Sequence, residues 1–216
     1  MKKIFYLILF MSPLFLGSCM NRAIYTSPDF PVKAQQHQTI AILPFETIIN
    51  LRPNQMRKLG PEGQRELEQK ESYAVQGALY SYFLKEKGKE DFSVDFQDVH
   101  KTNALLFRNN ITRENIRDYT HEELADLLGV DAIVSGSLQT DKPLSDGAAI
   151  ALSLLFEPYS VTTNTGTASI AINDGQTGEL LWRYHKSLDG GLGSDTYSVI
   201  NAIMRKASRK LPYGKG

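Results

Sequence analysis

Cysteine is almost absent from this chain: one residue of 216, Cys19, is a cysteine. A single cysteine excludes an internal disulfide and a zinc site built from several thiolates, so the fold must be held together by its core. An excess of charge of one sign is also absent, because 24 lysines and arginines balance 24 aspartates and glutamates. Proteins that bind nucleic acid carry a basic surface, so the balanced charge indicates no nucleic-acid partner.

Long hydrophobic runs are missing too, although one short run stands near the start of the chain. Residues 4–16 are apolar apart from Ser12 and Pro13, and they are fewer than the about 20 apolar residues that a membrane-spanning helix needs. Lys2 and Lys3 precede this run, and small residues follow it. A positive start, an apolar run and small residues before a cleavage point predict a secretory signal peptide over residues 1–18.

The apolar run ends in Leu16-Gly17-Ser18-Cys19. This segment resembles the lipobox of bacterial lipoproteins, in which a leucine and two small residues precede an obligatory cysteine. The resemblance implies cleavage before Cys19, a diacylglycerol linked to its sulfur and an acyl chain on its new amino terminus, with no other cofactor. Each buried CH₂ group contributes about 0.8 kcal/mol to membrane binding, and two or more chains hold a protein firmly. We therefore expect a membrane anchor at Cys19.

Residues 19–38 are predicted to be a lipidated tether, because they contain prolines and a polar glutamine-rich end without a helical or strand period. Met20 follows the cysteine where an aspartate retention signal would stand. In lipoprotein sorting this implies the outer membrane, and the absence of an acidic run after Cys19 favours its periplasmic face.

Residues 39–216 are predicted to form one α/β domain, a mixed-sheet sandwich with the order β-α-β-α-β, a hairpin and a C-terminal helix. Residues 47–63 hold two prolines and two glycines and are predicted to be a long loop. Thr120 and Glu123 match a helix capping box, and Gly129 is the expected helix end. Strands are predicted at 39–43, 92–96, 131–138, 167–174 and 179–187, and helices at 64–87, 100–107, 120–128 and 196–211.

Three motifs follow the lipobox in order: TIAILPF at 39–45, ELADLLGVDAIVSGS at 123–137 and DGQTGELLW at 174–182. Over residues 39–211 they resemble the curli-secretion-channel-like and penicillin-binding-protein-activator-like lipoproteins. They are also similar to related lipoproteins of unknown function and to the N-terminal domain of the periplasmic translocation protein of the Tol system. The resemblance implies a compact α/β domain that acts without catalysis, through protein contacts at the cell envelope, and it does not select a partner.

No catalytic or metal-binding pattern is visible in the sequence. Ser135-Gly136-Ser137 lacks the leading glycine of a nucleophile elbow, which favours a packing role for these small residues. The glycine-rich segment 189–196 lacks the lysine of a phosphate-binding loop and is predicted to be a flexible link, with Ser194 or Asp195 as helix cap. None of the four histidines has metal-ligand spacing to another: His37, His100, His121 and His185.

The apolar run from Ala148 to Phe156 leaves two interpretations open. It is either a buried helix or strand, or a surface that meets a partner, a neighbouring subunit or the bilayer. The second interpretation assigns an interaction surface to five residues: Ile150, Leu152, Leu154, Leu155 and Phe156. The polar stretch 159–167 argues against a full membrane hairpin of the kind that curli-channel-like proteins insert.

Three functional hypotheses follow from these patterns. The first is a non-enzymatic outer-membrane lipoprotein that serves as an envelope adaptor or accessory subunit for a partner protein that the sequence does not identify. The second is a subunit of an oligomeric secretion channel resembling the curli exporter, which requires a homo-oligomer. The third is an enzyme or ligand-binding module whose pocket is not visible in the sequence.

Overall fold

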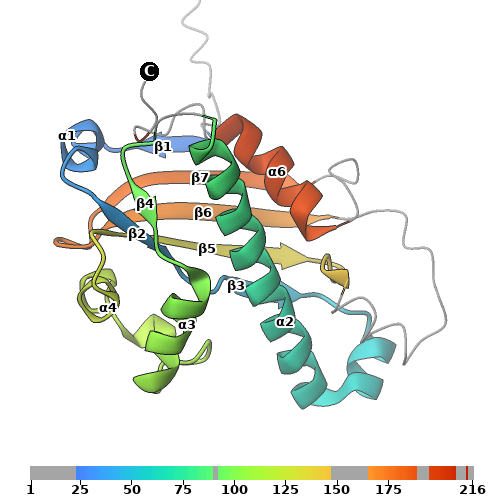
Figure 1. The fold of residues 1–216 in the computed structure, drawn as a ribbon. Coiled ribbons are helices and arrows are strands. Elements are labelled where there is room, and N and C mark those ends of the chain that lie inside the picture. Colours follow the sequence, from blue (N-terminus) through green and yellow to red (C-terminus); the bar gives the residue numbers. More distant parts are fainter. Residues whose placement is uncertain (1–22, 90–91, 147–164, 189–194, 208–212, 214–216) are drawn as a thin grey trace, which may run out of the picture.

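The computed structural model describes residues 23–89, 92–146, 165–188, 195–207 and 213 (Figure 1). The predicted signal peptide, the lipobox Leu16-Gly17-Ser18 and the lipid attachment residue Cys19 lie outside these residues. The candidate interaction surface at Ile150, Leu152, Leu154, Leu155 and Phe156 also lies outside them. These assignments therefore stay predictions.

The described residues form one open mixed sheet of seven strands, in the order β1-β7-β6-β5-β2-β4, with β3 also paired to β5. β2 (Thr39–Ile42) runs parallel to β5 (Ala132–Thr140) and to the short β4 (Asp95–Phe96). β6 (Gly166–Asp174) and β7 (Leu180–Leu188) continue the sheet from β5 as antiparallel neighbours. The predicted fold class, a single mixed-sheet α/β domain, is confirmed.

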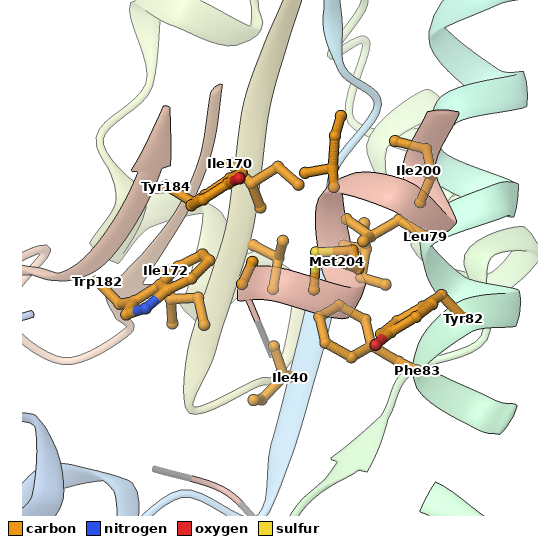
Figure 2. Close-up of a cluster of buried hydrophobic side chains, with 14 of the residues drawn as sticks. Ile40, Leu79, Tyr82, Phe83, Ile170, Ile172, Trp182, Tyr184, Ile200 and Met204 are labelled. Atoms are coloured by element: carbon orange, nitrogen blue, oxygen red, sulfur yellow. The ribbon is translucent and has the colours of Figure 1, made fainter. Parts of the chain in front are cut away.

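The two faces of the sheet are covered by different helices. The first face carries Ile40 and Ile42 and packs on α2 (Pro53–Lys87) and α6 (Thr196–Ala207), which lie across the strands in Figure 1. Figure 2 shows this core, which contains Leu79 and Met204 from the helices and Ile172 from the sheet. The second face carries Ala41 and Ile133 and packs on α4 (His121–Leu128) and the end of α3 (Val99–Arg108).

Burial on both faces explains why the β2 sequence is an apolar run rather than an alternating pattern. Ile40, Ala41 and Ile42 are all fully buried, although they point alternately to opposite faces. Burying each isoleucine side chain contributes roughly 1.5–3 kcal/mol. The parallel pairs β2–β5 and β2–β4 are thus held by two hydrophobic clusters, one on each side.

The predicted loop at 47–63 is wrong. It contains part of β3 (Glu46–Ile49) and the first turns of α2, which begins at Pro53. α2 has a break at Gly60, whose φ is 71°, and Pro61 starts the helix again. Proline is suited to the first turn of a helix because it lacks only an N–H that would have no helical partner there. The two prolines therefore mark helix starts, and β3 is a short strand that pairs with β5.

The prediction of a tether without regular structure over residues 19–38 is wrong for residues 23–38. β1 (Ile24–Thr26) pairs antiparallel with β7, and α1 (Phe30–Ala34) packs on the domain. Phe30 is fully buried and meets the ring of Tyr213 edge-on, with 5.2 Å between ring centroids. Contacts distant in sequence therefore order this segment, and neither short element has a local period that the sequence could reveal.

The remaining predicted elements are confirmed, with one shortened. α2 ends at Lys87 with Gly88 as its cap, and α3 and α6 stand where helices are expected. Residues 208–211 of the helix predicted at 196–211 lie outside the described part of the chain. Asp195 caps α6 by accepting from the Ser198 amide at 2.9 Å. Of the predicted strand 92–96, β4 covers two residues. Its alternation is nevertheless real, because Phe92, Val94 and Phe96 are buried.

Local helix and turn signals behave largely as expected. Thr120 Oγ1 accepts from the Glu123 amide at 3.2 Å, while Glu123 Oε2 accepts from the Thr120 amide at 2.8 Å, so the capping box is confirmed. Gly129 ends α4 with a φ of 65°. In the turn between β6 and β7, Gly178 has a positive φ. Gly175 does not have a positive φ. A Cβ at this position would come within 2.8 Å of the Asp131 carbonyl, so a larger side chain would not fit there.

α2 carries a line of polar side chains on its buried side: Glu68, Glu71, Ser72 and Gln76. Glu71 is fully buried, and its carboxylate accepts from the amides of Leu144 and Ser145 at 3.1 and 2.9 Å. Its other oxygen accepts from the Thr196 hydroxyl at 3.1 Å. A buried carboxylate is tolerated when hydrogen bonds satisfy it, so Glu71 links α2 to the segment after β5 and to the start of α6.

A second buried polar chain connects the two ends of the domain. His37 Nδ1 lies 2.7 Å from the Tyr213 hydroxyl, and His37 Nε2 lies 3.0 Å from Asp174 Oδ1. Lys33 from α1 lies 3.2 Å from the other Asp174 oxygen. Burial opposes ionisation of Asp174, but hydrogen bonds from Thr177, His37 and Lys33 outweigh it and lower its pKa to about 2. We call these residues the terminal clip.

The lowered pKa of Asp174 predicts a loss of stability in acid. Its usual value is 3.8, so the ionised carboxylate stabilises the fold fully above that pH, and the contribution is lost as the pH falls toward 2. The pKa difference corresponds to about 2 kcal/mol. Urea unfolding measured between pH 7 and pH 2 should show that the free energy of unfolding falls in acid. This fall should be about 2 kcal/mol smaller in the Asp174→Asn variant than in the unsubstituted chain.

Asp126→Asn is the matched control, because Asp126 is exposed on α4 and this substitution also removes one negative charge. It should keep the acid dependence of the unsubstituted chain. An Asp174→Asn variant whose acid dependence equals that of the control would refute the role of the terminal clip.

Candidate functional site

The sheet is interrupted between β2 and β3, and a groove opens at the interruption. β2 pairs with β5 as far as Ile42 and Val134, and β3 resumes the pairing at Glu46 and Ser137. The groove has a volume of about 390 Å³, within the range of small-molecule sites. We call it the sheet-break groove, and it is lined by Leu43, Pro44, Phe45, Glu46, Arg113, Ile116, Arg117, Tyr119, His121, Leu124, Ser135, Gly136, Ser137, Ser169, Ala171 and Arg183.

Polar side chains of α2 hold the interrupted backbone. Gln76 Nε2 donates to the Ile42 carbonyl at 2.7 Å, and Ser72 Oγ donates to the Phe45 carbonyl at 2.6 Å. Both carbonyls are therefore satisfied although they lie at the ends of the strand break. A buried carbonyl without a partner costs about 1–3 kcal/mol, so these two bonds make the interruption tolerable. Pro44, in the middle, has no N–H that needs an acceptor.

Gly136 allows the connection between β2 and β3 to lie close against β5. A Cβ at this position would collide with the Phe45 ring and with the backbone oxygen of Ser169. Phe45 is buried in the first-face core, so its ring cannot move aside without loss of packing. The expected packing role of the small residues at 135–137 is therefore correct for Gly136, while Ser135 and Ser137 line the groove.

Three arginines line the sheet-break groove, and they differ in their partners. Arg113 Nη2 donates to Glu68 Oε2 at 2.9 Å and also to the Thr47 carbonyl. Arg117 Nη2 lies 2.7 Å from Glu46 Oε1. Arg183 is exposed on β7 and has neither an acidic nor a hydrogen-bonding side-chain partner among the described residues.

His121 and Ser135 form a polar pair in the groove wall. His121 Nε2 lies 3.4 Å from Ser135 Oγ. Burial lowers the pKa of His121, with Glu122 opposing the change, so the ring is neutral at pH 7. A serine–histidine nucleophile needs a third group that orients the histidine, and within the described part of the chain no acidic side chain hydrogen-bonds to His121. The pair contributes polar atoms to the groove wall.

The four histidines do not come together. His37 belongs to the buried terminal clip, while His100 and His185 are exposed and are not part of the groove lining. Among the residues that the structure describes, no group of three or more His, Cys, Asp or Glu side chains is placed to hold a metal ion. In the same residues, no helix has the length and apolar character for a membrane crossing.

The groove was not predictable as a site because its polar residues come from separate parts of the chain. Arg113 precedes α4, His121 starts it, and Ser135 and Arg183 lie on β5 and β7. One signal was available: the period of two along a strand places Ser135 and Ser137 on the same face. The arginines give no such signal, since isolated arginines are common in any soluble protein and are mostly exposed.

Comparisons with known proteins find similarity to several solved structures. No protein-family model and no curated protein matches it. Lipoprotein GNA1162 from Neisseria meningitidis is 13% identical with a TM-score of 0.46, and the alignment covers 80% of this chain and 98% of that chain. A PelC dodecamer structure from Paraburkholderia phytofirmans is 9% identical with a TM-score of 0.41, covering 89% and 96%.

The LpoB C-terminal domain from Escherichia coli is another similar structure, at 11% identity and a TM-score of 0.33, covering 74% of this chain and 98% of that chain. LpoB-like proteins are one of the groups that the three sequence motifs resemble. All three TM-scores lie below 0.5. These likenesses therefore carry no conclusion about what this chain binds or does.

Proposed function

We propose that this chain is a non-enzymatic lipoprotein of the outer membrane that faces the periplasm and serves as an envelope adaptor or accessory subunit. The observation that carries the proposal is Leu16-Gly17-Ser18-Cys19 at the end of a signal-like apolar run. A thioether-linked diacylglycerol requires that cysteine, and the added acyl chain makes the attachment firm. The α/β domain then works at the membrane surface through its contacts with another envelope protein.

The second face of the sheet supports a role in protein contacts. Beyond α4, strands β7 and β1 present Arg183, His185 and Tyr25, and Tyr25 lies opposite Arg183 in the strand register. Tyr25 is 50% exposed. Tyrosine and arginine are among the residues enriched where proteins bind one another, because they combine a large contact area with polar ends. This face thus carries the side chains that an adaptor needs.

The non-enzymatic part of the proposal rests on the family resemblance of the three sequence motifs, and the sheet-break groove adds a serine–histidine pair. Its histidine and serine are 3.4 Å apart, and the third member of a nucleophilic triad does not contact them within the described residues. The alternative of an oligomeric channel subunit depends on residues 148–167, most of which lie outside the described part of the chain. No described contact favours that alternative, so the adaptor is the function that we propose.

Replacement of the lipid-bearing cysteine tests the anchor. Cys19→Ala should move the protein from the membrane fraction to the soluble periplasmic fraction, because no acyl chain can be attached to alanine. Cell fractionation with immunoblotting measures the shift. Ser18→Ala is the matched control, since it keeps a small residue before the cysteine, and it should stay in the membrane. Retention of the Cys19→Ala protein in the membrane would refute the lipid anchor.

Site-specific crosslinking tests the adaptor role. A photo-crosslinking amino acid at Tyr25 should capture an envelope protein in intact cells, identified by mass spectrometry. Tyr73 is the control position: it is 44% exposed but lies on α2, which packs on the opposite face of the sheet. The proposal expects a discrete product at Tyr25 that is absent at Tyr73. The same products at both positions, or none at Tyr25, would contradict a partner on the second face.

A further inference from the structure

We propose that the sheet-break groove binds a carboxylate attached to a short apolar body, with Arg183 as the charged contact and Ser137 and Ser169 as hydroxyl donors. The site does not depend on the lipid anchor, and it shares Arg183 with the partner surface proposed above. It gives the domain a ligand-binding capacity that the sequence alone does not indicate.

The first argument is the charge of the groove. Arg113 is neutralised by Glu68 at 2.9 Å, and Arg117 is neutralised by Glu46 at 2.7 Å. Arg183 is the third arginine of the lining, and the described residues offer it no acid. The groove therefore has one uncompensated positive charge beside two neutral pairs. A guanidinium in this state binds a carboxylate through two parallel hydrogen bonds.

The second argument is a set of donors without acceptors. Ser137 of β5 and Ser169 of β6 lie directly opposite each other in the antiparallel register, and both line the groove. Neither hydroxyl hydrogen-bonds to another described residue. The Nε atom of Arg113 is also buried without an acceptor. A buried donor without a partner costs about 1–3 kcal/mol, so a ligand oxygen that reaches Arg113 Nε gains by satisfying it. Ser137 and Ser169 are half-buried, and their hydroxyls add two donors to the groove.

The strand register brings these donors within reach of Arg183. Ser135, Ala171 and Arg183 form one row across β5, β6 and β7, and Ser137 and Ser169 start the next row. Neighbouring strands lie about 4.8 Å apart, and Ala171 between them is small. The long Arg183 side chain can therefore lie over Ala171 toward the serines, which leaves one anionic group in contact with all three.

The third argument is the apolar wall. Leu43, Ile116 and Leu124 line the groove beside the polar floor. Leu43 and Leu124 belong to the second-face core, and Ile116 packs against it. Sites for small organic ligands combine walls of this kind with a few placed polar groups. The volume of about 390 Å³ accepts several carbon atoms in addition to a carboxylate.

The charge count favours a carboxylate over a phosphate. A monoanion neutralises the single uncompensated charge of Arg183, whereas a phosphate dianion would leave one negative charge without a partner in the groove. His121 does not change this count, because it is neutral at pH 7 and already contacts Ser135. The carboxylate can belong to a free organic acid or to the C-terminus of a polypeptide that ends in an apolar residue.

Calorimetric titration of the full chain in detergent tests the site. The first pair of probes is hexanoate and hexanamide, which have the same apolar body and differ in the charged group. A second pair distinguishes the source of the carboxylate: acetyl-Ala-Ala-Leu with a free C-terminus, and the same peptide as an amide. Charge-assisted hydrogen bonds should make the acid of at least one pair bind about 10- to 100-fold more tightly than its amide.

Arg183→Gln removes the uncompensated charge from an exposed strand position. It should weaken binding of the acid about 10- to 100-fold and leave binding of the amide unchanged. Arg205→Gln is the matched control, because Arg205 is exposed on α6 over the opposite face and lies outside the groove lining. The control should bind both acids as the unsubstituted chain does.

A tighter peptide acid assigns the site to polypeptide C-termini, and a tighter hexanoate assigns it to small organic acids. Three results would overturn the proposal: equal affinity for acid and amide, equal effects of the Arg183→Gln and Arg205→Gln substitutions, or no binding of any probe at about 50 mM, a concentration beyond weak ligand affinities. None of these results bears on membrane attachment through Cys19, so failure here is separable from failure of the proposed function.

Discussion

The interruption between β2 and β3 is the constraint on which the rest of the structure depends. Because the chain leaves β5 after Ile42 and rejoins it at Glu46, backbone carbonyls at the break need partners from outside the sheet. Ser72 and Gln76 of α2 supply them, which fixes α2 on the first face and leaves the second face open at the same point. The sheet-break groove thus lies on the face of the sheet opposite to the helix that satisfies the backbone at the break.

The same helix explains how a domain without disulfides holds its distant segments. Glu71 binds the chain after β5 and the start of α6, while Glu68 accepts from the Ile49 amide and pairs with Arg113 at the groove. The terminal clip does the equivalent work at the other end, where His37 joins Tyr213 to Asp174. Buried polar groups of this kind specify a single arrangement because each misplacement leaves a charge or donor unsatisfied.

Elements with strong local signals were predictable from the sequence, and those that depend on distant contacts were not. The Thr120 capping box, Gly129 and the hairpin around Gly178 are local, so α4, β6 and β7 stand where expected. Pro53 and Pro61 were misinterpreted because proline marks a helix start as well as a loop. β1 is ordered by pairing with β7, and α1 is ordered by packing of Phe30 on Tyr213. The groove results from the break between β2 and β3. No local period encodes such contacts.

Amide hydrogen exchange in a Ser72→Ala/Gln76→Ala variant tests most directly whether α2 holds the strand break. The Leu43 amide donates to the Val134 carbonyl at 2.9 Å, so its exchange rate reports on the end of β2 at the break. The account predicts that this amide exchanges about tenfold or more faster relative to the amides of β6 and β7, because opening becomes local. Exchange that accelerates equally at Leu43 and throughout β6 and β7 would contradict it.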